Sequence, residues 1–257
     1  MITDSFDNSS IITSPEKILR KGEKIADTVI CTFSCMVFDY INYSYSGKIF
    51  NEIRSCNGSK HIIKLNVDFT TLISYMLGVG ATSAGNEIIE LYHLTDIKNI
   101  VVFGSCGILD KGLEKENTII VPTEAYRDEG MSYHYMKPSD YITITKSDET
   151  KDLIEKQNSD YKVVQGRVWT TDAFYHETEY QRDKRKQEGC LAVEMEIAGM
   201  QAVCNYYNIN LFPFLVLGDL VDTSPKDYNP EGLHSANHCL SALDIALSMA
   251  IEIENSK

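Results

Sequence analysis

The stretch CLAVEMEIAGMQAV (residues 190–203) runs from an apolar segment typical of a buried β-strand into a segment with helical spacing. Two carboxylates, Glu194 and Glu196, flank Met195 at the junction between them. Carboxylates are rarely buried unless a partner pairs with them. The junction therefore has two interpretations: either both side chains point to water, or a polar ligand meets the chain here.

The same alternation of strand and helix continues on both sides of this stretch. Strands are predicted at 28–33, 72–79, 99–104, 162–171, 190–195 and 211–218, and helices at 86–94, 176–189, 196–207 and about 231–254. This pattern predicts an α/β three-layer sandwich with a mixed, largely buried central sheet. With 257 residues and no linker, the chain is expected to form a single domain over 1–257, with roughly the first 12 residues poorly ordered.

The composition narrows the classes of partner. A formal net charge of -13 disfavours nucleic acid and anionic membranes, although it permits an anionic substrate held by local donors. No apolar run approaches a membrane span, and no signal-peptide pattern begins the chain. The seven cysteines form no CxxC motif, which favours reduced thiols in a cytoplasmic protein. His234 and His238 lack a third ligand, so no metal is expected.

Two loops of small residues follow predicted strands. GVGATSAG (78–85) precedes a helix, and GSCG (104–107) ends the strand NIVVF. Neither matches a dinucleotide fingerprint or a GxxxxGK[ST] phosphate loop, and each alone fits a tight turn. Together they would lie at the carboxyl edge of an open α/β sheet, where ligands bind. Free N–H groups at the helix start would favour an anion or a polar sugar there.

Five segments in order carry a resemblance over roughly residues 72 to 250. They are GVGATSAGNEIIEL, NIVVFGSCGILDKG, TTDAFYHET, CLAVEMEIAGMQAV and LVLGDLVDTS. The chain resembles the nucleoside phosphorylase family, which includes hexameric purine nucleoside phosphorylase, uridine phosphorylase and methylthioadenosine/adenosylhomocysteine nucleosidase. The resemblance implies a pentosyltransferase that cleaves a nucleoside, uses phosphate as co-substrate and needs no cofactor. The first seventy residues match poorly.

The resemblance also assigns roles around the sugar. It places Met195 and Glu196 under the ribose, with Glu196 gripping the two hydroxyls and Glu194 and Ala81 close by. It matches Asp219 to the acid that protonates or hydrogen-bonds the departing purine. A carboxyl at the end of a buried strand is expected to have a raised pKa, as a general acid requires. By itself, Asp219 is equally typical of a helix N-cap, and the two roles can coexist.

The aromatic pair in TTDAFY provides candidate residues for binding the base. The resemblance places Phe174 and Tyr175 against the base, while core packing is an equally good interpretation for Tyr175. The Gln and Arg of uridine-specific members are replaced by Thr178 and Tyr180. A purine or a modified nucleoside is therefore favoured over uridine.

The phosphate site departs from the family pattern. The family's arginine before GS is Val102 here, and CTFSCMVFDY (31–40) lacks the expected GDPxR motif. Hydrolysis by water is therefore an alternative to phosphorolysis, although the N-terminal Glu that nucleosidases use to activate water has no match. A third alternative is a nucleoside-binding or sensing protein that has lost turnover.

Four residues remain as candidate contacts to phosphate or another nucleophile. Gly104 and Ser105 belong to GSCG, and Arg54 is a candidate that a neighbouring subunit would supply. Arg127 is the fourth, with a solvated loop arginine as the commoner interpretation. Since family members complete each site from an adjacent subunit, a homo-oligomer is expected, either a dimer or a trimer of dimers.

Overall fold

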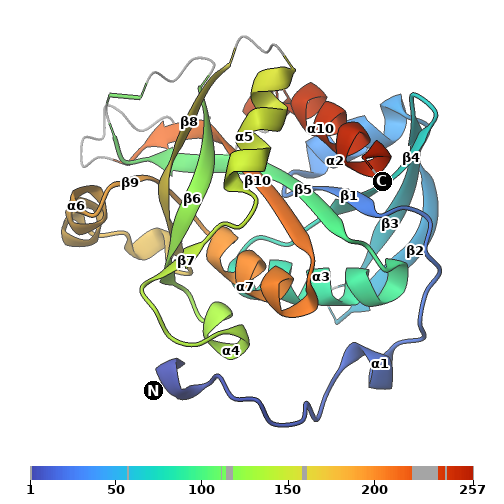
Figure 1. The fold of residues 1–257 in the computed structure, drawn as a ribbon, viewed down its shortest axis with the longest axis horizontal. Helices are drawn as coiled ribbons and strands as arrows, with labels where there is room; N and C mark the ends of the chain where they lie inside the picture. Colours follow the sequence, from blue (N-terminus) through green and yellow to red (C-terminus); the bar gives the residue numbers. More distant parts are fainter. Residues whose placement is uncertain are drawn as a thin grey trace.

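The computed structural model shows a twisted mixed sheet with helices on both faces (Figure 1). It describes residues 2–56, 58–110, 112–113, 118–157, 161–221, 237–240 and 242–256, and of residues 219, 237 and 238 the backbone alone. The strands are β1 (Thr28–Thr32), β2 (Lys48–Ser55), β3 (Gly58–Val67), β4 (Thr70–Met76), β5 (Asn99–Ile108), β6 (Thr118–Asp128), β7 (Tyr141–Thr143), β8 (Lys162–Thr171), β9 (Cys190–Glu194) and β10 (Asn210–Leu220). The helices are α1 (Pro15–Ile18), α2 (Cys35–Ser44), α3 (Ala81–Thr95), α4 (Ser132–Tyr135), α5 (Ser147–Lys156), α6 (Glu179–Gln187), α7 (Ile197–Tyr207), α9 (Asn237–Leu240) and α10 (Leu243–Asn255), with 3-10 turns η1 (Ile2–Asp4) and η2 (Phe174–His176).

The sheet closes on itself at one end. Within the described residues the strand order is β10-β6-β8-β9-β5-β1-β4-β3-β2, with β7 beside β6, and β10 pairs with β5 as well as with β6. The strands β10, β6, β8, β9 and β5 therefore form a ring. Ile120, Val168 and Leu215 on three of these strands belong to one buried apolar cluster, which also includes residues of α7. Since β1 pairs in parallel with β4 and β5, and β5 in parallel with β10, the carboxyl ends of these four strands meet at one edge.

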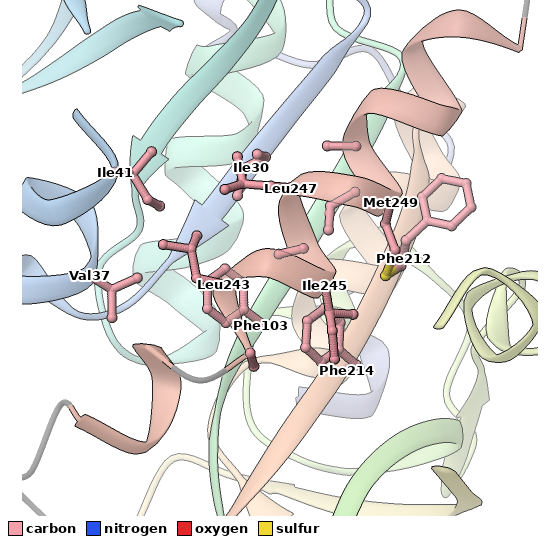
Figure 2. Close-up of a cluster of buried hydrophobic side chains, with 14 of the residues drawn as sticks. Ile30, Val37, Ile41, Phe103, Phe212, Phe214, Leu243, Ile245, Leu247 and Met249 are labelled. Atoms are coloured by element: carbon pink, nitrogen blue, oxygen red, sulfur yellow. The ribbon is translucent and has the colours of Figure 1, made fainter. Parts of the chain in front are cut away.

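The two faces of the sheet carry separate cores, as strand periodicity requires. Along β5, Val101 and Phe103 point to the face covered by α2, α5 and α10, while Ile100 and Val102 point to the face covered by α3 and α7. Figure 2 shows the first core, where Phe103 stacks on Phe214 with ring centroids 5.5 Å apart. The three layers confirm the predicted fold class.

The structure also contains elements that the sequence patterns did not predict. The six predicted strands and the helices α3, α6 and α7 are present, whereas β2, β3, β6, β7, α1, α2, α4 and α5 were missed. The β2 strand is mostly exposed, so it shows no long apolar run by which to recognise it. Of the predicted last helix, residues 231–236 lie outside the described residues, residues 237–240 form α9 and residues 243–254 lie in α10. The described part is therefore two helices rather than the single helix predicted. None of the described helices is long and apolar enough to cross a membrane.

Candidate functional site

The Glu194 carboxylate caps the helix that follows it. Its Oε2 accepts hydrogen bonds from the backbone N–H groups of Glu196 at 2.6 Å and Ile197 at 2.7 Å, and its Oε1 accepts from the Thr170 hydroxyl. The Thr170 Oγ1 in turn accepts from the Ala198 N–H at 3.1 Å. Glu194 and Thr170 together satisfy three N–H groups that the first turn of α7 leaves unpaired. Glu194, the first carboxylate of the motif, therefore has a structural role as the cap of α7.

Glu196 joins the starts of two helices. Its Oε1 accepts from the Gly80 N–H at 2.7 Å, and Gly80 is the residue that precedes α3. Gly80 has a φ of 94°, a left-handed conformation that favours glycine. Glu196 itself is only 9% exposed, so the interpretation of a solvated carboxylate is wrong. The carboxylate and the two helix N-termini form one polar junction, with Ala81 at the first position of α3.

A third carboxylate, which the sequence analysis missed, holds the glycine loop. Glu87 in α3 accepts from the Gly78 N–H through Oε2 at 2.8 Å and from Lys60 Nζ through Oε1 at 2.6 Å. The loop between β4 and α3 is thereby fixed against its own helix. A carboxylate within the apolar pattern NEIIEL was the one feature that could have indicated this role.

A small cavity opens beside the two glutamates. Its lining residues come from the segment after β1, the middle of β5 and β10, the end of β9 and the start of α7: Phe33, Val102, Phe103, Gly104, Ser105, Glu194, Glu196, Ile197, Phe214 and Leu215. The structure thus brings Gly104 and Ser105 together with both glutamates. A larger cavity of about 450 Å³ lies at the opposite end of β5 and β10, around Asn99 and Asn210, and is separate from this site.

The electrostatics of the cavity disfavour extra negative charge. Burial raises the pKa of Glu194, and the nearby charge of Glu196 raises it further, against the hydrogen bonds from Thr170 and the α7 N–H groups. Burial likewise raises the pKa of Glu196, and the N–H of Gly80 opposes this rise. The arrangement suits a ligand that brings hydroxyl donors or develops positive charge.

The two candidate arginines lie elsewhere. Arg54 is on the edge strand β2, where its side chain is 79% exposed and paired with Glu52. Arg127 is only 2% exposed, so its interpretation as a solvated loop arginine is wrong. Its Nε donates to Ser132 Oγ at 2.7 Å and its Nη1 to the Lys137 carbonyl at 2.8 Å. Neither arginine lines the cavity.

The aromatic candidates follow the strand that carries Thr170. Phe174 and Tyr175 form the turn η2, with ring centroids 4.9 Å apart, and Tyr175 is 94% exposed, so it is not core packing. Beside them, burial raises the pKa of Glu177 to about 7, a feature that no sequence pattern indicated. Neither ring is among the residues that line the cavity.

Residue 219 lies at the carboxyl end of β10. The backbone of this strand runs parallel to β5, with Leu217 opposite Cys106 and Leu220 opposite Ile108. Residue 219 therefore lies near the end of its strand, beside the GSCG segment of β5. The predicted loop at 104–107 is wrong, because these residues continue β5 as far as Ile108. The Asp219 side chain, like His234 and the side chain of His238, lies outside the described residues.

Comparison with known families shows which family the chain belongs to. The model of the phosphorylase superfamily matches residues 43–244. The chain belongs to this superfamily. Membership confirms the resemblance found in the sequence and the prediction of an enzyme. It also shows that the related region begins earlier than residue 72, and that it includes the edge hairpin of β2 and β3.

Relatives of this superfamily member are named as purine nucleoside phosphorylases. A DeoD-type purine nucleoside phosphorylase from Thermoanaerobacter sp. (strain X514) is 26% identical over 209 residues, covering 79% of this chain and 86% of the relative. Another from Bacillus thuringiensis (strain Al Hakam) is 27% identical over 176 residues, covering 68% and 73%. The crystal structure of purine nucleoside phosphorylase from Toxoplasma gondii in complex with immucillin-H has a TM-score of 0.75 at 16% identity and covers 91% and 94% of the two chains, which shows a shared fold.

Proposed function

We propose that this enzyme cleaves the N-glycosidic bond of a purine nucleoside. The observation that carries the proposal is the buried carboxylate of Glu196, held by the Gly80 N–H where two helices begin and a cavity opens. The names of the relatives support a purine nucleoside as the substrate.

The chemistry follows from the charge that develops during cleavage. As the C1′–N bond lengthens, positive charge builds on the ribose and the electron pair moves to the base. An ionised Glu196 can accept hydrogen bonds from the two ribose hydroxyls and stabilise this positive charge, since the interaction strengthens in the transition state. Glu194 keeps Glu196 in place through the α7 cap, and Met195 between them packs under the sugar in this proposal.

The departing base needs a proton or a hydrogen bond. We assign this role to Asp219, at the end of β10, with Phe174 and Tyr175 stacking on the base. Asp219→Asn should therefore slow cleavage of natural nucleosides much more than cleavage of a nitrophenyl riboside, whose leaving group needs no proton. Parallel assays on both substrates, with a melting curve of the variant, measure this. Equal losses on both substrates would remove Asp219 from the catalytic groups and fit a structural cap instead.

A panel of nucleosides tests the proposal. Purified enzyme is incubated with purine nucleosides, uridine and thymidine, in ribose and deoxyribose forms, and free base is measured by chromatography. Release of a purine base is the expected result. Tight binding of nucleosides with no base released under any condition would contradict the proposal and would favour a nucleoside sensor. We place the reaction in the cytoplasm, because all seven cysteines are present as thiols.

A further inference from the structure

We infer that the group which accepts the ribosyl moiety at this site is water, and that the enzyme is a nucleoside hydrolase. The inference rests on the proposed function and specifies its second substrate. Phosphate was the acceptor expected from the sequence resemblance, with water as the alternative. Three observations at the cavity favour water.

The first observation concerns the GSCG segment, which lies inside β5, where Gly104 pairs with Leu215 and Ser105 with Val216 of β10. Phe33 follows β1 and packs against Gly104, so closely that a methyl group at position 104 would meet its ring at 3.1 Å. This segment is therefore part of the sheet rather than a loop of free N–H groups for an anion, and a phenyl ring covers it on this side. An apolar surface stabilises no dianion, because the charge loses hydration without gaining a partner.

The second observation is the charge of the cavity lining. The described residues that line the cavity include two carboxylates, Glu194 and Glu196, and neither a lysine nor an arginine. The side chain at position 102 is a valine, 1% exposed and packed in the core under α3 and α7. A phosphate dianion here would lie beside Glu194 and Glu196 with no cation between them, and like charges repel strongly in a buried site. A neutral nucleophile avoids this repulsion.

The third observation concerns the N-terminus of α2, a helix that begins close to the cavity residue Phe33. The start of α2 lies directly after Phe33, where free N–H groups could bind an anion. Here the Ser34 hydroxyl accepts from the Val37 N–H at 3.4 Å, and the Ser34 N–H donates to Thr32 Oγ1 at 3.3 Å. The helix start is thus partly satisfied by its own residues, while the exposed Ser105 lies at the cavity, where its hydroxyl can hold a water molecule.

The reaction balances without another reactant. The water oxygen attacks C1′ and forms the new C–O bond, while the C1′–N bond breaks and its electron pair goes to the base nitrogen. The base gains one proton at that nitrogen from the general acid, and the attacking water loses one proton to solvent, from which the acid is recharged. The products are the free base and ribose, and no phosphate ester forms.

The test measures the sugar product with and without phosphate. The enzyme is exchanged into phosphate-free buffer and assayed on the nucleoside that it cleaves best, with and without added inorganic phosphate, in water enriched in oxygen-18. We expect equal rates of base release in both buffers and free ribose carrying one oxygen-18 atom at C1. Base release that requires phosphate, with ribose 1-phosphate as the product, would overturn the inference and leave the proposed function intact. No base release in either buffer would overturn both.

A variant controls for a cation supplied by another subunit. Arg54 is exposed on the sheet edge and is the candidate for such a contribution. If water is the acceptor, Arg54→Ala should leave the oxygen-18 content of the ribose and the indifference to phosphate unchanged. A phosphate-stimulated rate in the native enzyme that disappears in Arg54→Ala would show that the neighbouring subunit completes a phosphate site, and would overturn the inference.

Discussion

At the scale of single residues, the two glutamates of the VEMEIAG motif have different hydrogen-bond partners and different roles. Glu194 accepts hydrogen bonds from the α7 cap and from Thr170, whereas Glu196 accepts from Gly80 before α3 and lines the cavity. The sequence predicted that this pair matters, because two carboxylates interrupt an apolar run. It could not predict which of them caps the helix, since the partner Thr170 lies in a distant strand.

Glu177 provides a residue-scale prediction about pH. Burial raises its pKa from an ordinary 4.5 to about 7, so the folded chain binds this proton more tightly than the unfolded chain. The free energy of unfolding should therefore fall as pH rises through this interval. Glu177→Gln removes the cost of ionising a half-buried carboxyl. It should raise stability relative to the native chain at pH 8 by about 1 to 3 kcal/mol, and by much less at pH 4.

Urea unfolding of both proteins at the two pH values measures this difference. Glu179→Gln, an exposed carboxylate in the next helix, serves as the control and should show no such pH dependence. A stability difference for Glu177→Gln that is the same at pH 4 and pH 8 would contradict the assigned pKa.

At the scale of elements, the site depends on how closely α3 and α7 approach. A Cβ at Gly199 in α7 would meet the Ala81 Cβ of α3 at 2.8 Å and Glu129 Oε2 at 3.3 Å. The close approach of the helices keeps Glu196 within reach of the Gly80 N–H. The sequence predicted both helices from their apolar spacing. It did not predict their contact, which the folded sheet sets by ordering strands that are distant in the chain.

Gly199→Ala should loosen this contact. We expect a loss of about 1 to 3 kcal/mol of stability, as overpacking typically causes, and a fall in kcat/KM because the helix starts move apart. The matched control is Gly189→Ala, where a Cβ meets nothing within 4 Å and only the φ of 87° is strained. The control should lower the melting temperature and spare kcat/KM. Full activity in Gly199→Ala would show that the spacing of α3 and α7 does not set the site.

At the scale of the whole molecule, the fold brings the loop before α3, the middle of β5 and β10 and the junction of Glu194 and Glu196 together. The loop before α3 was predictable from its small residues, whereas the predicted loop at 104–107 is part of β5. The ring closure through β5 and β10 was not predictable, because pairing between strands about a hundred residues apart leaves no local pattern. The edge hairpin was also missed, since its exposed residues carry little apolar periodicity.

Assembly is a prediction at this scale. We expect a homo-oligomer, a dimer or a trimer of dimers, in which a neighbouring subunit covers the exposed edge of the site. Sedimentation velocity at the enzyme concentrations used for assays measures this. A catalytically competent monomer at those concentrations would contradict a site shared between subunits.

The measurement that tests the central claim most directly compares the native enzyme with Glu196→Gln on its best nucleoside. The neutral amide keeps the size of the side chain and removes the charge that would hold the ribose hydroxyls. We expect kcat/KM for base release to fall by roughly a hundredfold or more while the melting temperature at pH 8 stays the same or rises. Glu23→Gln, an exposed carboxylate outside the site, should change neither quantity. Unchanged kinetics in a folded Glu196→Gln protein would contradict the account.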